Sequence, residues 1–221
     1  MKMKAILFDL DGTLVKSTID FAKMKTEMRI FLRKYGVDFS HLRNNATTMQ
    51  LIEHARKSME EDSFSQEEIT QVFANVKRIM DEVEMENANK TQPIPGVFKI
   101  INQLSSKGIR IAVVTRGCRN YAFLALQSSG LLKLVDVIVA RDDVTNPKPH
   151  PFHLQYAISA LGVTSDECLM VGDTLMDGLC AKRANVPFVA VLTGHNREEE
   201  FKKNGYTNVL NSVLDLPKII K

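Results

Sequence analysis

Residues 4–14 read KAILFDLDGTL, and this stretch indicates the kind of fold. The run 4–8 is short and largely apolar, which is typical of a strand buried in a parallel sheet. Asp9 and Asp11 follow it directly, before Gly12 ends the regular pattern. The stretch therefore predicts a buried strand with polar, functional side chains at its C-terminal end.

Helices and strands alternate in the pattern that follows Gly96. Short apolar runs occur between segments with a helical period of three to four residues. The predicted helices are 97–107, 119–129, 151–161 and one through Leu179, and the predicted strands are 109–114, 135–140, 168–171 and 188–192. This alternation predicts an α/β fold with a Rossmann-like, doubly wound parallel sheet and helices on both faces.

Residues 16–90 have an entirely helical pattern instead. Apolar residues recur at steps of three and four in two stripes, which are Phe21, Met24, Met28, Phe31 and Tyr35, and then Ile69, Val72, Phe73, Val76, Met80 and Val83. Ser65 and Glu68 are spaced as a capping box before the second stripe, and residues 42–59 form a looser helical segment. We expect an all-helical cap at 16–90, inserted into a core of 1–15 and 91–221, that closes over the strand ends and selects the substrate.

The composition argues against several classes of protein. Hydrophobic residues make up 44% and charged residues 25% of the 221 residues, as in an ordinary globular protein. No run approaches the ~18 apolar residues of a membrane span. The net charge of +3 is spread among acids, and the three cysteines form no CxxC pair. We expect a cytoplasmic protein that binds neither membrane nor nucleic acid, and the oligomeric state stays open.

Polar residues follow the ends of four predicted strands. They are Asp9 and Asp11 after the first, Thr115 and Arg116 after the second, Asp142, Asp143 and Lys148 after the third, and Asp173 and Asp177 after the fourth. Ligands of such sheets bind at the carboxyl ends of the strands. Crowded carboxylates repel one another unless a cation lies among them, and oxygen ligands suit Mg²⁺. A Mg²⁺ site is favoured over ordinary surface acids, because independent strands agree on the placement.

Other metal and phosphate sites do not fit the spacing. An EF-hand loop needs glycine at its sixth position, whereas Gly12 is fourth from Asp9. The sequence contains neither GxGxxG nor GxxxxGK[ST], the glycine-rich signatures of dinucleotide and P-loop nucleotide sites.

Four motifs, in their order along the chain, resemble the haloacid dehalogenase-like hydrolase superfamily. They are DLDGTL at 9–14, Thr115, NPKP at 146–149 and VGDTLMD at 171–177. The helical insert after the first motif resembles a C1-type cap, so the resemblance covers nearly the whole chain. It implies a Mg²⁺-dependent phosphatase, similar to phosphoglycolate phosphatase, that acts on a small phosphorylated metabolite.

The resemblance also implies roles for the acids. Asp9 is the expected nucleophile, which forms an aspartyl phosphate. Asp11 is the expected general acid and base for the leaving alcohol and the attacking water, and its presence favours phosphate over halide. Asp9, Asp173 and the backbone carbonyl of Asp11 are the expected Mg²⁺ ligands. Asp177 is expected to orient either Lys148 or a metal-bound water.

The other pocket residues are expected to bind the phosphate group. The Thr115 hydroxyl donates to a phosphoryl oxygen, and the Lys148 ammonium offsets the negative charge around the nucleophile. Gly12, Arg116 and Gly117 complete the predicted phosphate site.

Two cations depart from the pattern of relatives. Arg116 stands where many relatives have asparagine, and it either forks onto a phosphate or acidic leaving group or pairs with Asp142 or Asp143. Lys16 stands where phosphoglycolate-specific relatives often have an acid. A solvated hinge lysine is favoured there over contact with a substrate anion.

Three histidines lie near the motifs. His150 and His153 are interpreted as capping or surface residues, because the sequence offers no third ligand for a metal site. His195 follows the last strong strand, and no partner for it is identified.

Three other functions remain as alternatives. A β-phosphoglucomutase-type phosphomutase uses the same aspartyl phosphate but returns the phosphoryl group to a sugar. A response-regulator receiver also gathers acids, a hydroxyl and a lysine around Mg²⁺, but it is shorter, has no cap and places its acids first. A non-catalytic binding module would be favoured by broken motifs, and these motifs are intact.

Overall fold

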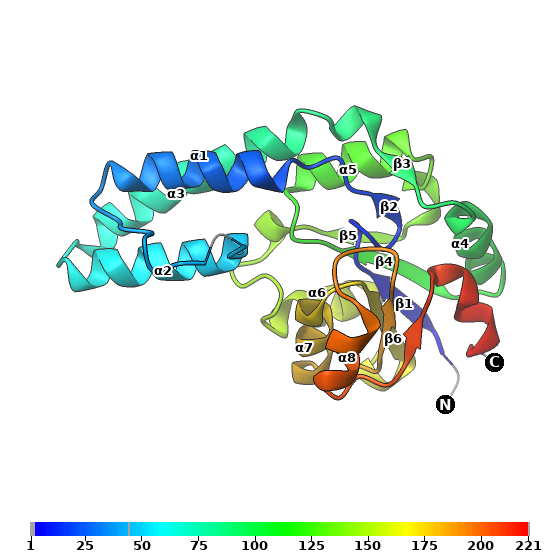
Figure 1. Cartoon of the computed structure of the whole chain (residues 1–221). Helices are drawn as coiled ribbons and strands as arrows, with labels where there is room; N and C mark the ends of the chain where they lie inside the picture. The colour runs from blue at the N-terminus through cyan, green and yellow to red at the C-terminus, as the bar shows by residue number, and fades with distance from the viewer. Residues whose placement is uncertain (1–2, 44, 221) are drawn as a thin grey trace. The chain divides into compact units, whose positions relative to one another are not determined.

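The computed structural model describes residues 3–43 and 45–220 (Figure 1). The chain forms two compact units. The core unit comprises Met1–Thr18 and Ala88–Lys221, and the helical unit comprises Ile19–Asn87. In the described part of the chain, no helix combines the length and the apolar character that crossing a membrane requires.

Six strands form the sheet of the core unit. They are β1 (Ala5–Phe8), β4 (Arg110–Val114), β5 (Val137–Val139), β6 (Cys168–Gly172), β7 (Phe188–Val191) and β8 (Val209–Leu210). Their order across the sheet is β5-β4-β1-β6-β7-β8, and every neighbouring pair is parallel. The predicted α/β fold with a parallel sheet is confirmed, and β1 lies between β4 and β6.

The other elements of the core unit surround this sheet. The helices are α4 (Val97–Ser106), α5 (Arg119–Ser128), α6 (Phe152–Leu161), α7 (Leu175–Arg183) and α8 (Glu198–Lys203). The 3-10 helices are η1 (Ala88–Lys90), η2 (Leu132–Leu134), η3 (Arg141–Asp143), η4 (Ser165–Glu167) and η5 (Val213–Lys218). A separate antiparallel pair joins β2 (Val15–Lys16) to β3 (Gln92–Pro93).

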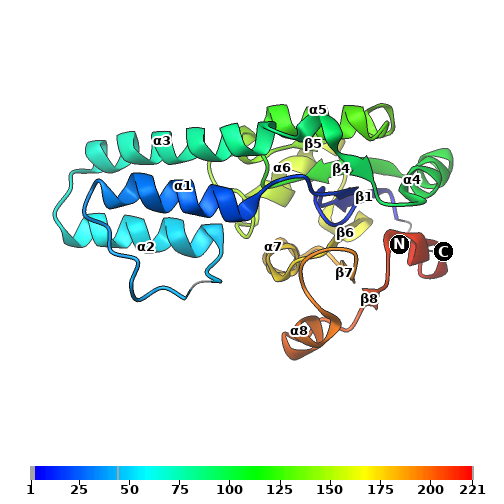
Figure 2. The ribbon, with the colours of Figure 1, turned by 45° about the horizontal axis from the view of Figure 1, so that its top comes forward.

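Helices cover both faces of the sheet. Ala5 and Leu7 of β1 pack in one buried apolar cluster with residues of α6 and α7. Ile6 and Phe8 are equally buried and point to the opposite face, because successive strand residues alternate. Helices α4 and α5 pack on that second face (Figure 2). The doubly wound arrangement leaves the carboxyl ends of the strands as the place for polar groups.

The fifth strand is shorter than the predicted strand 135–140. Strand β5 begins only at Val137, and the reason lies in the preceding residue. The side chain of Asp136 accepts a hydrogen bond of 2.7 Å from the backbone N of Ile111. The Asp136 side chain thus accepts from a backbone N–H of β4 that would otherwise bond to the backbone of a longer β5. The pairing of β5 with β4 therefore begins only at Val137.

The described residues of the helical unit form three helices around their own apolar core. They are α1 (Phe21–Arg33), α2 (Thr48–Glu61) and α3 (Gln66–Met85). Met24 and Met28 lie in this core, as predicted, together with Leu32. Phe21 is in the predicted helix as the first residue of α1, and its side chain is 48% exposed. The predicted Ser65–Glu68 capping box is present at the start of α3.

Helix α2 begins later than the predicted segment 42–59. Thr47 caps it by accepting from the backbone N of Gln50 at 3.2 Å, and the Gln50 side chain accepts from the backbone N of Thr47 at 2.8 Å. This reciprocal cap fixes the first turn at Thr48. Asn44, which falls in the predicted segment, lies outside the described residues.

The limits of the two compact units differ by a few residues from the predicted domain limits at 16 and 90. Val15 and Lys16 pair with Pro93 and Gln92, so the first residue of the predicted cap, Lys16, belongs to a strand of the core unit. The entirely helical pattern expected from residue 16 onward therefore does not hold at Lys16. The assignment of 16–90 as a cap stays a prediction.

Candidate active site

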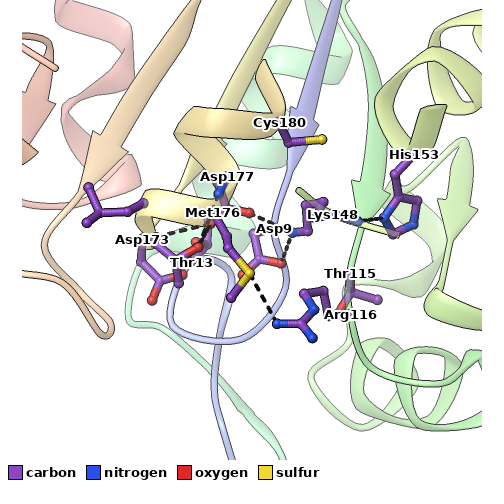
Figure 3. A network of polar contacts seen from close by, with 12 residues as sticks. Asp9, Thr13, Thr115, Arg116, Lys148, His153, Asp173, Met176, Asp177 and Cys180 are labelled. Carbon is purple, nitrogen blue, oxygen red and sulfur yellow. Dashed lines mark hydrogen bonds and ion pairs between the residues drawn. The ribbon is translucent and has the colours of Figure 1, made fainter. Parts of the chain in front are cut away.

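Polar side chains gather where three adjacent strands end. Asp9 directly follows β1, Thr115 follows β4, and Asp173 follows β6. These three side chains are 7%, 2% and 2% exposed. Because β4, β1 and β6 are neighbours in a parallel sheet, their carboxyl ends bring these groups to one edge (Figure 3).

Lys148 lies among the acids. Its Nζ donates to Asp9 Oδ1 at 2.6 Å and to Asp177 Oδ1 at 2.7 Å, and its side chain is 2% exposed (Figure 3). Buried charges need partners of this kind. The structure thus brings together three residues that lie far apart in the sequence, in the arrangement that an anion-neutralising lysine requires.

The start of α7 orients Asp177. Its Oδ2 accepts from Thr174 Oγ1 at 2.6 Å and from Thr174 N at 3.0 Å, while Thr174 Oγ1 accepts from Asp177 N. This capping box fixes the carboxylate, so that its other oxygen meets Lys148. Of the two roles predicted for Asp177, contact with Lys148 has direct support from these distances.

Asp173 is held by backbone and hydroxyl donors. Its Oδ1 accepts from Thr13 Oγ1 at 3.1 Å, and its Oδ2 accepts from His195 N at 2.7 Å. Two glycines leave room for this carboxylate. A Cβ added at Gly194 would lie 1.9 Å from Asp173 Oδ2, and one at Gly12, where φ is +78°, would lie 2.6 Å from it.

The electrostatics of the acids favour a bound cation. Burial raises the pKa of Asp9 well above its ordinary value despite the charge of Lys148, and Asp177 and Asp173 add to the rise. Burial and the charge of Asp177 raise the pKa of Asp173 to about 6. Burial alone would lower the pKa of Lys148, but the charges of Asp177 and Asp9 outweigh it and raise that pKa. One lysine therefore leaves the three carboxylates short of positive charge.

The donor set suits a hard divalent cation. One carboxylate oxygen each from Asp9, Asp173 and Asp177 lies within 4.8 Å of the others. These are oxygen ligands, which hard divalent cations prefer. An added cation would lower the pKa values that burial and mutual repulsion raise.

The loop after β4 is built to present the Thr115 hydroxyl. Thr115 Oγ1 accepts from Gly117 N at 3.0 Å, which leaves the hydroxyl proton to be donated elsewhere. Arg141 holds this loop, because its Nη1 donates to Arg116 O at 2.8 Å and its backbone N donates to Gly117 O at 3.1 Å.

The Arg116 side chain donates from Nη1 to Met176 Sδ at 3.2 Å (Figure 3). The acids proposed as its partners make bonds with Arg119. Asp142 Oδ1 accepts from Arg119 N at 2.8 Å, and Asp143 Oδ2 accepts from Arg119 Nη1 at 2.5 Å. Both acids thus have Arg119 as a partner, and the two alternatives for Arg116, binding a phosphate or acidic leaving group and pairing with one of these acids, both stay predictions.

Asp11 lies beyond the end of β1, in a turn. Leu14 N and Val15 N both donate to Leu10 O, at 2.9 and 3.0 Å. Strand alternation therefore does not set the direction of the Asp11 side chain. The Asp11 carboxylate accepts from the hydroxyl of Tyr121.

Other highlighted side chains lie at the margin. His150 Nδ1 accepts from Phe152 N at 3.2 Å, which is the predicted capping role. His195 contributes its backbone N to Asp173. Lys16 is exposed in β2, which agrees with a solvated lysine.

His153 is a supporting residue that the sequence did not reveal. The interpretation as a capping or surface residue is wrong, because the side chain is fully buried. Its Nδ1 accepts from Lys148 N at 3.0 Å, so Nε2 carries the proton and donates to Val139 O at 3.2 Å. Burial and the charge of Lys148 lower its pKa to about 3, which keeps the ring neutral. His153 thus ties the Lys148 backbone to β5.

Replacing His153 by phenylalanine should leave the buried backbone N of Lys148 without its acceptor, while Val139 O keeps its bond from Thr115 N. We expect the free energy of unfolding to fall by about 2 kcal/mol, within the usual penalty for unsatisfied buried groups. His153→Asn, which retains an acceptor near Nδ1, should lose less. Urea unfolding followed by circular dichroism measures both.

The control for this pair is His150→Asn, at an exposed position just before α6, which should change the free energy of unfolding by less than about 0.5 kcal/mol. Equal stability of wild type and His153→Phe would contradict the supporting role.

Known proteins resemble this chain along its whole length. Residues 6–191 match the family of haloacid dehalogenase-like hydrolases. The pyrophosphatase PpaX of Halalkalibacterium halodurans is 32% identical over 222 residues, which cover 100% of this chain and 98% of the relative. The phosphoglycolate phosphatase of Nitrosococcus oceani is 25% identical over 220 residues, 97% of this chain and 95% of the relative. The solved structure of a hydrolase from Pseudomonas syringae is 24% identical with a TM-score of 0.70, covering 98% of this chain and 97% of that one.

Proposed function

The chain belongs to the haloacid dehalogenase-like hydrolase family, and from this premise we propose that it is a Mg²⁺-dependent phosphatase acting through an aspartyl phosphate on Asp9. Its relatives are named as phosphatases, so hydrolysis of a phosphate bond is the activity that the family supports. The metal and the covalent intermediate are our inference from the site.

One observation carries the proposal. The Asp9 carboxylate lies at the end of the central strand, bonded to the buried Lys148 and beside Asp173 and Asp177. A buried carboxylate, with a cation at hand and further acids for a metal, is suited to attack the phosphorus atom of a group whose oxygen charges must be neutralised.

The chain's own residues divide the reaction into two steps. In the first, a carboxylate oxygen of Asp9 bonds to phosphorus, the bond to the leaving oxygen breaks, and Asp11 gives that oxygen a proton. In the second, Asp11 takes a proton from water, the water oxygen bonds to phosphorus, and the bond to Asp9 breaks to release phosphate. Lys148 and the hydroxyl of Thr115 offset charge on the phosphoryl oxygens. When held by Asp9, Asp173 and the Asp11 carbonyl, Mg²⁺ would supply additional charge neutralisation.

The substrate class that we propose is a small phosphate compound with a second anionic group. The named relatives act on pyrophosphate and phosphoglycolate, which both have one. Arg116, next to Thr115, offers a planar guanidinium suited to such a group. We further propose that the helical unit, as the cap, selects among such compounds.

Release of inorganic phosphate tests the function. Purified protein should release phosphate from p-nitrophenyl phosphate, pyrophosphate or phosphoglycolate with Mg²⁺, and lose at least about 90% of this activity in EDTA, since no protein group replaces the metal charge. The melting temperature should rise with Mg²⁺, because a ligand at 100 times its Kd adds about 2.7 kcal/mol.

Asp173→Asn is the control variant for the metal, and it should lose most of the Mg²⁺-dependent rise in melting temperature. Asp166→Asn, at an exposed position just before β6, should retain it. Transfer of the phosphoryl group to a second sugar hydroxyl without release of phosphate would instead identify a mutase. Activity unchanged by EDTA would contradict the metal requirement.

A further inference from the structure

The backbone around Asp11 is fixed by a tight turn. Gly12 N donates to Val15 O at 2.8 Å, and Thr193 Oγ1 donates to Gly12 O at 2.6 Å. The position of the Asp11 Cα is therefore set by the fold. What remains to be set is the rotation of its side chain, which decides where the carboxyl oxygens point.

Tyr121 reaches this carboxyl group from a distant part of the chain. It lies in the first turn of α5, is fully buried, and donates from its hydroxyl to Asp11 Oδ1 at 2.5 Å, across 110 positions of sequence. Its ring lies against the loop after β4, because a Cβ added at Gly117 would be 2.6 Å from Tyr121 Cδ1. The ring of Tyr121 thus packs against the loop after β4 while its hydroxyl bonds to Asp11.

The hydrogen bond between the two side chains runs from the phenol to the carboxyl group. Burial and the negative charge of Asp11 raise the pKa of Tyr121 far above its ordinary value. The hydroxyl therefore keeps its proton and directs it to Oδ1, and it does not compete with Asp11 as an acid.

We propose that Tyr121 is a positioning residue that holds Oδ1 of Asp11, so that Oδ2 is the oxygen that exchanges the proton. This proposal rests on the proposed function. In the first step Oδ2 gives its proton to the leaving oxygen as the phosphorus–oxygen bond breaks and the bond to Asp9 forms. In the second step Oδ2 takes a proton from the attacking water. Tyr121 gives and takes no proton, and it limits the rotation of the carboxyl group.

The test compares two substrates that need the acid to different extents. Phenoxide is a stronger base than p-nitrophenoxide, so it needs a proton from the general acid and leaves as phenol. The less basic p-nitrophenoxide leaves without protonation. For Tyr121→Phe, which keeps the ring, we expect kcat/KM to fall about tenfold on phenyl phosphate and by no more than about twofold on p-nitrophenyl phosphate. A general acid contributes about 10²- to 10⁴-fold, and mispositioning forfeits a part of it. The ratio kcat/KM is used because it reports the steps up to departure of the leaving group.

A double variant separates positioning from packing. In an Asp11→Asn background, adding Tyr121→Phe should not lower kcat/KM on phenyl phosphate further, because the group it positions is gone. Tyr156→Phe, the same change at a 45% exposed tyrosine of α6, should leave kcat/KM unchanged on both substrates. An equal loss on the two substrates, or a further loss in the Asp11→Asn background, overturns the proposal and assigns Tyr121 to packing.

The outcome is distinct from a failure of the proposed function. If the mechanism itself were wrong, Asp9→Asn would retain activity on p-nitrophenyl phosphate whatever Tyr121→Phe does. If the mechanism holds and only the positioning role is wrong, Asp9→Asn is inactive while Tyr121→Phe matches wild type on both substrates.

Discussion

Replacing Asp9 by asparagine should abolish phosphate release, with kcat/KM lower by at least about 10³-fold. Removal of a nucleophile in other enzymes costs this much or more. The amide has nearly the size of the carboxylate, but its oxygen is a poor nucleophile and carries no charge to attract a metal. Release of p-nitrophenol and of inorganic phosphate, both with Mg²⁺, measures the loss.

The fold of the Asp9→Asn variant should survive. Burial raises the pKa of Asp9, so the charged form is unfavourable in the folded state without metal, and a neutral amide relieves that penalty. We expect the free energy of unfolding in EDTA to stay within about 1 kcal/mol of wild type. Asp166→Asn serves as the matched control for activity. A variant at Asp9 with full activity would exclude the aspartyl-phosphate mechanism.

Replacing Lys148 by methionine should reduce both activity and stability. The variant retains an unbranched side chain but leaves Asp9 and Asp177 facing each other without the cation that bonds to both. Breaking a buried ion pair on one side costs about 3–5 kcal/mol. At pH 8 we expect urea unfolding to show a fall of that order in the free energy of unfolding. We also expect kcat/KM to fall by at least about 10²-fold.

The destabilisation of Lys148→Met should depend on pH in a defined direction. In this variant the pKa of Asp9 should lie still higher than in wild type, since the opposing charge of Lys148 is gone. A carboxyl group whose pKa is raised on folding destabilises the folded state at high pH, and this penalty disappears as falling pH protonates the group. The difference in free energy of unfolding between Lys148→Met and wild type should therefore become smaller from pH 8 to pH 5.

Two further lysine variants test whether the charge of Lys148 is responsible for these effects. Lys148→Arg keeps the charge but not the shape of an ammonium, so it should fold better than Lys148→Met and still lose activity. Lys99→Met, at an exposed position of α4, should match wild type in both measurements. Lys148→Met with wild-type stability at every pH would show that the lysine does not compensate the two acids.

Much of the fold could be read from local patterns. Strand β1 and helix α6 were predicted to within a residue or two, because apolar runs and turn residues are local signals. The fifth strand was overestimated because its first residues depend on a bond between Asp136 and Ile111, which no local pattern contains. The pairing of β2 with β3 was missed for the same reason, since two residues on each side carry no periodicity.

The candidate site divides in the same way. Its acids, hydroxyl and lysine could be selected from the sequence because they follow strand ends. His153 and Tyr121 could not, since each lies on a helix where its spacing is that of an ordinary buried or surface residue. Thr13 stood inside the first motif, and its bond to Asp173 could have been suspected from that position.

The sequence by itself determined the alternation of helix and strand, and with it the edge at which the polar residues would meet. It also determined their order along the chain, which carried the family resemblance. Tertiary structure alone decided the contacts, because distances such as the 2.6 Å between Lys148 and Asp9 join residues 139 positions apart. Burial likewise belongs to the folded chain, and burial is what raises the pKa of Asp9 and keeps His153 neutral.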